Sequence, residues 1–194
     1  MKLKKILKLC KQAEQYLIYD NRQIADQPCS NQWIGTRDAL YLPTRMPYLV
    51  EDSICTMCDL SEKQRNDWDI QHDEQWAFDW SLMNEDPSDT PADLMGLSIM
   101  VHGEELLPLK VEKELVWIWS KYLTPLEDDL SRLTFHYREA NGCPYIIVKD
   151  GMFIIASIRP EDIKKDKSVV ERMGQIAAGM GMRVLNVDTG EILE

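Results

Sequence analysis

Apolar residues recur at helical spacing near the start of the chain. Residues 2–14, "KLKKILKLCKQAE", place one set of apolar side chains on one side of a helix and a set of lysines on the other. The apolar set is Leu3, Ile6, Leu7, Cys10 and Ala13, and the basic set is Lys4, Lys5, Lys8 and Lys11. The pattern predicts an amphipathic helix with a basic face.

Short alternating runs follow this helix and predict strands joined by tight connections. The predicted strands cover residues 16–20, 32–35 and 39–43. Two short helices are predicted next, over residues 50–60 and 61–68. The second begins with a capping box, because Ser61 is followed three residues later by Gln64.

The second half of the chain has the alternation and turn residues of antiparallel hairpins. The predicted strands cover residues 97–103, 105–111, 115–119, 134–139, 145–149, 152–158, 183–187 and 191–194. Asp150 and Gly151 lie between two apolar runs, which is the strongest short signal for a hairpin. A helix is predicted over residues 125–133 because Pro125 suits a first helical position. The last helix is predicted to begin near Pro160 and to end at the glycines of "AAGMG".

These elements predict an α+β fold with a mainly antiparallel sheet and helices on one face. The predicted connections are too short for parallel crossovers. The chain is expected to form a single compact unit over residues 1–194. The order helix, strand, hairpin, helix occurs twice, which a duplication would explain as halves at 1–69 and 96–194, separated by an acidic insert or long loop at about 70–95. The alternative is two unrelated hairpins in one domain.

Acidic residues are concentrated in one segment of the chain. The net charge is −11, and residues 66–109 contain eleven carboxylates and no Lys or Arg. The rest of the chain is balanced, which leaves room for a basic surface on an acidic protein. The sequence has no apolar run of membrane-spanning length, and its five cysteines have irregular spacing. The expectation is a cytoplasmic protein with reduced thiols and no membrane contact.

Several short motifs match only part of a catalytic or metal-binding pattern. Cys55 and Cys58 have the spacing of half a zinc site, but His72 is the only nearby further ligand in the sequence. We interpret the two cysteines as buried small hydrophobes. The segment "VDTGE", residues 187–191, matches the aspartic protease triplet and is interpreted as a turn. We therefore predict no catalytic residues, no metal and no cofactor.

The tryptophans of the acidic segment are candidates for partner binding. Trp68, Trp76 and Trp80 lie among carboxylates, where full burial is difficult. The alternative is a loop that folds back over the core. Carboxylates and His72 between Asp67 and Glu74 would also suit a divalent cation, although a run of carboxylates is usually a solvated face.

The string "QWIGTRDALYLPTRMPYLVEDSICTMCDLSEKQR" follows a Lys-rich helix and a strand that ends at Tyr19 and Asp20. With these elements the chain resembles a family of small uncharacterised proteins encoded in prophages of Firmicutes. The resemblance rests on no catalytic motif and implies a phage-derived gene. The order of elements in the second half is also similar to the repeating unit of DNA sliding clamps. Those proteins join an acidic overall charge to basic helices that face DNA, but this chain is short for two full clamp domains.

The leading hypothesis is a non-enzymatic, phage-derived protein that acts on duplex DNA or on a replication partner, as a clamp-like processivity or accessory factor, with a homo-oligomer as one arrangement. Such DNA binding would be independent of base sequence and carried by exposed helix faces. The candidate DNA-binding residues are Lys4, Lys5, Lys8, Lys11, Lys164, Lys165 and Arg172. The second hypothesis is an adaptor without DNA contact, whose acidic aromatic segment binds a basic surface on a host or phage protein. The third is a metal-dependent nuclease.

Overall fold

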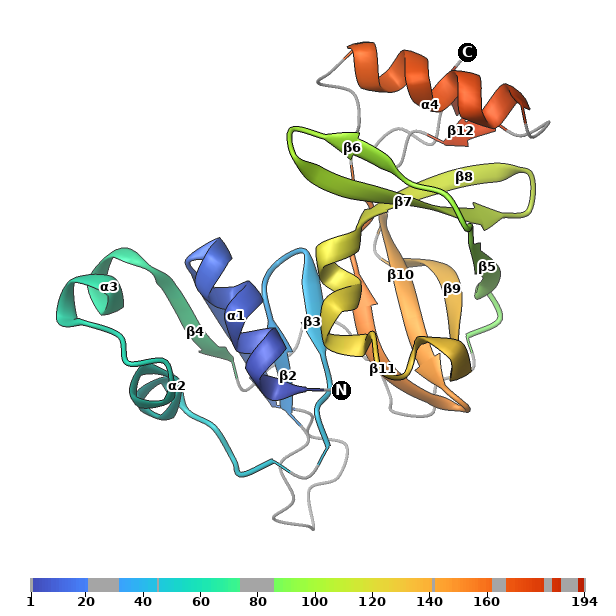
Figure 1. Cartoon of the computed structure of the whole chain (residues 1–194). Coiled ribbons are helices and arrows are strands. Elements are labelled where there is room, and N and C mark those ends of the chain that lie inside the picture. The colour runs from blue at the N-terminus through green and yellow to red at the C-terminus, as the bar shows by residue number, and fades with distance from the viewer. Residues whose placement is uncertain are drawn as a thin grey trace.

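A computed structural model gives an α+β fold and confirms the predicted fold class (Figure 1). The structure describes residues 2–20, 32–44, 46–73, 86–140, 142–161, 167–179, 183–185 and 192–193. In this part of the chain thirteen strands form one mixed sheet, in which most neighbouring strands are antiparallel. The strand order is β13-β12-β8-β7-β5-β9-β10-β11-β3-β2-β1-β4, and β6 pairs with β7.

The N-terminal elements follow the predicted pattern closely up to the third helix, and one strand that was not predicted comes after it. They are α1 (Leu3–Ala13), β1 (Gln15–Asp20), β2 (Gln32–Gly35), β3 (Ala39–Tyr41), α2 (Glu51–Met57), α3 (Glu62–Asp67) and β4 (Asp69–Asp73). The capping box of α3 is confirmed, because the Gln64 amide donates to Ser61 Oγ at 3.3 Å and the Ser61 amide donates to Gln64 Oε1 at 3.0 Å.

Tight antiparallel connections dominate the second half of the chain. Its elements are β5 (Thr90–Leu94), β6 (Ile99–Val101), β7 (Glu104–Val111), β8 (Glu114–Trp119), η2 (Ser120–Leu126), η3 (Leu130–Arg132), β9 (Leu133–Ala140), β10 (Cys143–Asp150), β11 (Phe153–Ile158), α4 (Lys167–Gly179), β12 (Arg183–Leu185) and β13 (Ile192–Leu193). The hairpin predicted at Asp150 and Gly151 is confirmed, and Gly151 has a φ of 61°, which glycine adopts without strain.

The helix predicted over residues 125–133 is wrong in type and in starting point. Two 3₁₀ segments, η2 and η3, occupy this region, and Pro125 lies inside η2. The Asp129 amide donates to the Leu126 carbonyl at 2.9 Å, three residues back, which is the 3₁₀ pattern. Because η2 follows β8 directly, the helical segment begins at Ser120, before Pro125.

The interpretation of residues 70–95 as a loop throughout is also wrong, because strands lie at both ends of this segment. β4 pairs with β1 in parallel, and β5 lies between β7 and β9 in the sheet. Neither strand has a run of alternating apolar residues, and β5 contains Pro91 and Asp93. Pairing with neighbouring strands therefore determines these elements more than local preference does.

The helices do not all cover the same face at β8. Val116 and Ile118 belong to the main core, to which α1 contributes Ile6, Leu9 and Cys10. The alternate residues Leu115 and Trp117 pack with Met173 and Ala177 of α4 in a second cluster. Since successive side chains of a strand point to opposite faces, α1 and α4 lie on opposite sides of β8.

The two hairpins that share an order of elements in the sequence meet in the sheet, where β3 pairs antiparallel with β11. Each belongs to a three-stranded meander, β1-β2-β3 or β9-β10-β11, that follows a helical segment. The surroundings differ, because β4 is parallel to β1 whereas β5 is antiparallel to β9. In addition, α1 is an α-helix and η2 is a shorter 3₁₀ helix. Matching halves of the sliding-clamp kind remain a prediction.

Candidate functional site

An open hollow of about 740 Å³ lies where α1, the β6–β7 hairpin and η2 meet. We call it the acidic groove. Its lining consists of Leu9, Gln12, Ala13, Thr36, Met100, Gly103, Glu104, Glu105, Ser120, Lys121 and Tyr122. Figure 1 shows β6 and β7 between α4 on one side and the pair formed by α1 and η2 on the other.

A tight turn places Glu104 and Glu105 at the start of β7, with Glu105 directly opposite Met100. His102 and Gly103 connect β6 to β7 and have φ values of 50° and 84°, as a two-residue hairpin of the favoured twist requires. Met100 is paired with Glu105 across the hairpin, so their side chains project from the same face. Met100 is 59% exposed, which is unusual for a large apolar side chain in the middle of a strand.

Lys121, which lines the groove, is held in place by several contacts. Its ammonium donates to Glu104 Oε2 at 2.6 Å and lies 5.5 Å from the ring centroids of both Trp119 and Tyr122. Trp119 Nε1 in turn donates to Glu161 Oε2 at 2.7 Å. These contacts hold Lys121 against two aromatic rings and compensate one of the two glutamate charges.

Tyr122 is held from both ends. Its hydroxyl donates to Asp38 Oδ2 at 3.2 Å, and its carbonyl accepts from the buried Tyr41 hydroxyl at 2.7 Å. Burial, with a further contribution from Asp38, raises the pKa of Tyr122 well above its usual range, so the phenol stays protonated and remains a donor. Glu105 has no ion-pair partner among the described residues, which leaves one uncompensated negative charge on the rim of the groove.

A second, smaller hollow of about 360 Å³ lies on the α4 side of β6. It is lined by Ile99, Met100, Arg172, Gln175 and Ile176. Met100 therefore borders both hollows. Arg172 supplies the one cation of this lining, so the two hollows differ in charge.

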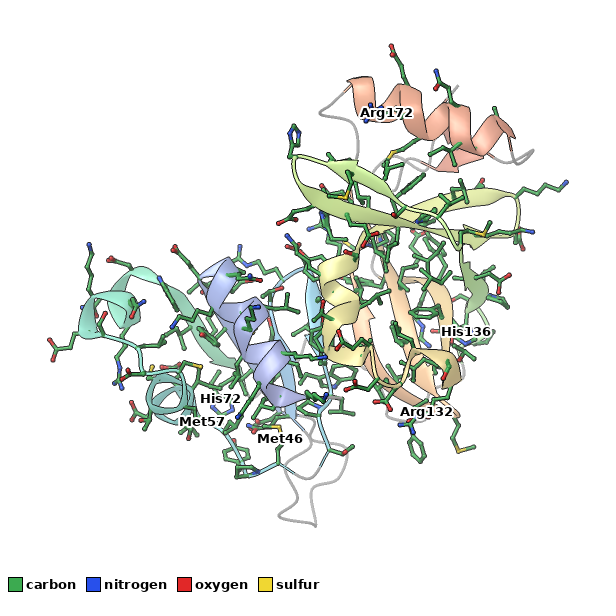
Figure 2. All side chains as sticks on the ribbon, in the orientation of Figure 1. Met46, Met57, His72, Arg132, His136 and Arg172 are labelled. Carbon is green, nitrogen blue, oxygen red and sulfur yellow. The ribbon has the colours of Figure 1, made fainter. Side chains whose placement is uncertain are left out.

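The lysines predicted to bind DNA do not all remain available on α1. Lys4, Lys8 and Lys11 are exposed and follow one another at spacings of four and three residues, which forms a stripe. The Lys5 ammonium pairs with Glu127, the residue directly after η2. Figure 2 places Arg172 on α4, with the β6–β7 hairpin between it and α1. Lys164 and Lys165 lie outside the described residues.

Among the tryptophans predicted to bind a partner, only Trp68 belongs to the described part of the chain. Its ring stacks on Tyr16, with centroids 6.1 Å apart and an angle of 20° between the planes. Trp68 is half-buried against the main core. The structure thus gives Trp68 a packing role, while Trp76 and Trp80 lie outside the described residues.

Asp69 and His72, two residues of the predicted alternative metal site, bind other side chains. Asp69 Oδ2 accepts from Gln15 at 2.7 Å and from Arg37 at 3.1 Å, and His72 Nε2 lies 2.9 Å from Asp20 Oδ1. Within the described residues, no group of three His, Cys, Asp or Glu side chains is arranged to hold a metal ion. Glu74 is not among those residues.

The cysteines of the CxxC motif lie at the end of α2, where Cys55 is buried and Cys58 is half-buried. Cys10 of α1 lies nearby, and burial together with the Cys58 thiol raises the pKa of Cys10 to about 12. A thiol with such a pKa stays protonated and is a poor nucleophile. These contacts agree with the interpretation of the cysteines as small core residues.

A buried ion-pair cluster has no counterpart among the motifs of the sequence. Asp89 accepts from Arg138 Nε and Nη2 at 2.6 and 2.8 Å and from Lys149 Nζ at 2.7 Å. The three side chains are between 2% and 10% exposed. Asp89 lies sixty positions from Lys149, so no local pattern could join them.

Burial of Asp89 by itself raises its pKa, but the hydrogen bonds and charges of Arg138 and Lys149 outweigh burial and hold the pKa below its usual range. His136 lies on the same strand as Arg138 (Figure 2). Burial and the Lys149 charge lower the pKa of His136, so its ring is neutral at pH 7. With Arg138 only 2% exposed, a substrate has no access to this cluster as it stands.

Comparison of the chain with protein-family models, with curated proteins and with solved structures finds no match. No helix in the described part of the chain is long and apolar enough to cross a membrane. Two features of the described residues bear on function, namely the acidic groove and the α1 lysine stripe.

Proposed function

We propose that the protein is a non-enzymatic interaction module whose acidic groove binds a basic segment of another protein. The observation that carries this proposal is the combination, in one open hollow, of an exposed Met100 with the uncompensated charge of Glu105. A large apolar side chain that borders a hollow is typical of recognition surfaces, and methionine adapts to ligands of varied shape.

The chemistry of the groove favours a segment that is both apolar and cationic. Leu9, Ala13 and Met100 offer apolar contact, whereas Glu105 attracts Lys or Arg. The charge of the whole chain, −11, adds a long-range attraction for a basic partner. Glu104 and Glu105 belong to the acidic segment of the sequence, so this proposal develops the adaptor hypothesis with different contact residues.

A panning experiment tests the proposal even though the partner protein is not identified. A random-peptide display library is selected on the intact protein at low salt, and the recovered peptides are sequenced. We expect enrichment of peptides that combine Lys or Arg with apolar residues. The recovered peptides should lose affinity for Glu105→Lys by roughly tenfold or more, because like charges are then juxtaposed.

Glu112→Lys is the matched control, because Glu112 is exposed and lies in the turn at the other end of β7. This variant has the same change of charge, and peptide binding should stay within about twofold of the wild type if long-range charge is a minor term. Enrichment without basic residues, or an equal loss of affinity in both variants, would contradict the proposed site.

A second candidate function, non-specific binding of duplex DNA, is favoured by the stripe of Lys4, Lys8 and Lys11. Three exposed lysines on one helix face can contact phosphates but cannot read bases. The stripe is smaller than the sequence suggests, since the Lys5 charge is compensated by Glu127. Binding through this stripe alone would be weak and strongly dependent on salt.

A further inference from the structure

The outer edge of β6, to which no strand of the described residues is paired, adds a second kind of contact to the acidic groove. Among the described residues, Ile99–Val101 pairs with β7 alone, and no further backbone hydrogen bond is made by these three residues. Exposed edges of this kind are usually protected by charged residues or proline. β6 has neither and presents Met100, 59% exposed, at its centre.

We infer that the partner segment binds as an added β-strand along the edge of β6, with basic side chains in the acidic groove and apolar side chains toward α4. This inference rests on the proposed function, since it specifies how the same groove takes its ligand. Strand addition gives affinity through main-chain hydrogen bonds and specificity through pockets for alternate side chains.

The two hollows beside β6 fit this alternation. Side chains of an added strand point alternately to the two faces of the sheet. On one face they meet Met100 and Glu105, which favour a cation with an apolar stem. On the other face they meet Ile99 and Ile176 together with Arg172, which favours apolar side chains and repels cations. The segment is therefore expected to alternate between basic and apolar residues.

Two fluorescein-labelled peptides of identical composition test the inference. One alternates four valines with three lysines, and the other has the three lysines in one block and the four valines in another. Both peptides carry the same charge, so a difference in affinity reports the order of their residues. Only the alternating peptide places its lysines on one face of an added strand and its valines on the other. Fluorescence anisotropy with the full chain is expected to show the alternating peptide binding at least about tenfold more tightly.

N-methylation of the alternating peptide is a second test. Methyl groups on the amides of every second residue should weaken binding when they are placed on one set of alternate residues and leave it unchanged on the other set, because only half of the N–H groups face β6.

The outcomes separate the inference from the proposal on which it rests. Strand addition would be overturned if the alternating peptide and the peptide with separate lysine and valine blocks bound equally, or if N-methylation had no effect on either set of alternate residues. The proposal that the groove binds a basic segment would then still stand. Strand addition is overturned in the same way if neither peptide binds while peptides from the panning do. If no basic peptide binds in either experiment, the proposed function itself fails.

Discussion

At the scale of single residues, the carboxylate of Asp89 binds two buried cations, Arg138 and Lys149. Asp89 lies just before β5, Arg138 is on β9 and Lys149 is on β10. The cluster therefore links the residue that precedes β5 to the paired strands β9 and β10. Breaking a buried pair by removing one partner leaves an uncompensated charge away from water.

Replacing Asp89 by Asn is therefore expected to destabilise the protein by roughly 3–5 kcal/mol in urea unfolding, since both buried cations lose their short ion pairs with Asp89. The control is Asp150→Asn, which removes an exposed partner 2.9 Å from Arg132. Exposed pairs contribute at most about 1 kcal/mol, so the control should unfold close to the wild type. Equal midpoints for the two variants would show that the cluster adds little to stability.

The same carboxylate predicts a pH dependence of stability. The pKa of Asp89 is lower in the folded protein than its unfolded value of about 3.9, so the unfolded state takes up the proton first as pH falls. The stabilisation is complete above about pH 4 and is lost as pH falls through the folded pKa. The difference in unfolding free energy between wild type and Asp89→Asn should thus narrow below pH 4. If this difference in unfolding free energy stayed constant below pH 4, the lowered pKa of Asp89 would be contradicted.

At the scale of elements, the β2–β3 hairpin depends on the absence of a side chain at Gly35. A Cβ added there would lie 2.0 Å from the Ala39 carbonyl oxygen, which is backbone and cannot move aside locally. The same oxygen accepts from the Thr36 amide at 2.8 Å and closes the turn. The hairpin matters for the whole sheet because β3 is the strand that meets β11.

Gly35→Ala is expected to destabilise the protein by at least about 1–3 kcal/mol, the usual range for an overpacked site. Gly174→Ala is the control, and it is expected to raise the stability of the protein. Gly174 lies within α4, where an added Cβ meets nothing within 4 Å, and alanine in a helix interior is favoured by about 0.5–1 kcal/mol. Thermal unfolding of both variants checks the pair, and a lower melting temperature for Gly174→Ala would contradict it.

The α1 helix carries the prediction about DNA. Replacing Lys4, Lys8 and Lys11 together by Gln should remove any retention on duplex DNA at low salt, because the contacts to phosphates are lost. On duplex DNA each phosphate contact releases counterions and contributes about 0.9 to the slope with which log affinity falls as log salt concentration rises. Lys63, Lys110 and Lys113 are equally exposed and provide a triple-Gln control. If the control loses retention to the same degree, net charge and not the stripe accounts for the binding.

At the scale of the whole molecule, local signals predict elements, and distant pairings determine the site. The helix at the start, the capping box at Ser61 and the Asp150-Gly151 hairpin each depend on residues a few positions apart, and all three are confirmed. The strand pairing of β4 and the cluster around Asp89 depend on residues about fifty or more positions apart, which no window of sequence reports. The groove likewise combines α1, β6–β7 and η2, so its two glutamates were visible only as members of an acidic segment.

NMR titration of the isotope-labelled protein with a basic peptide maps directly whether the peptide binds in the acidic groove. We expect the most enriched basic peptide from the panning to shift the backbone amides of residues 12–13, 99–105 and 120–122, which lie in the lining of the acidic groove or next to it in the chain. The amides near Lys4 should stay in place. Shifts centred on the lysine stripe of α1, or spread evenly over the surface, would contradict a basic-segment site in the groove.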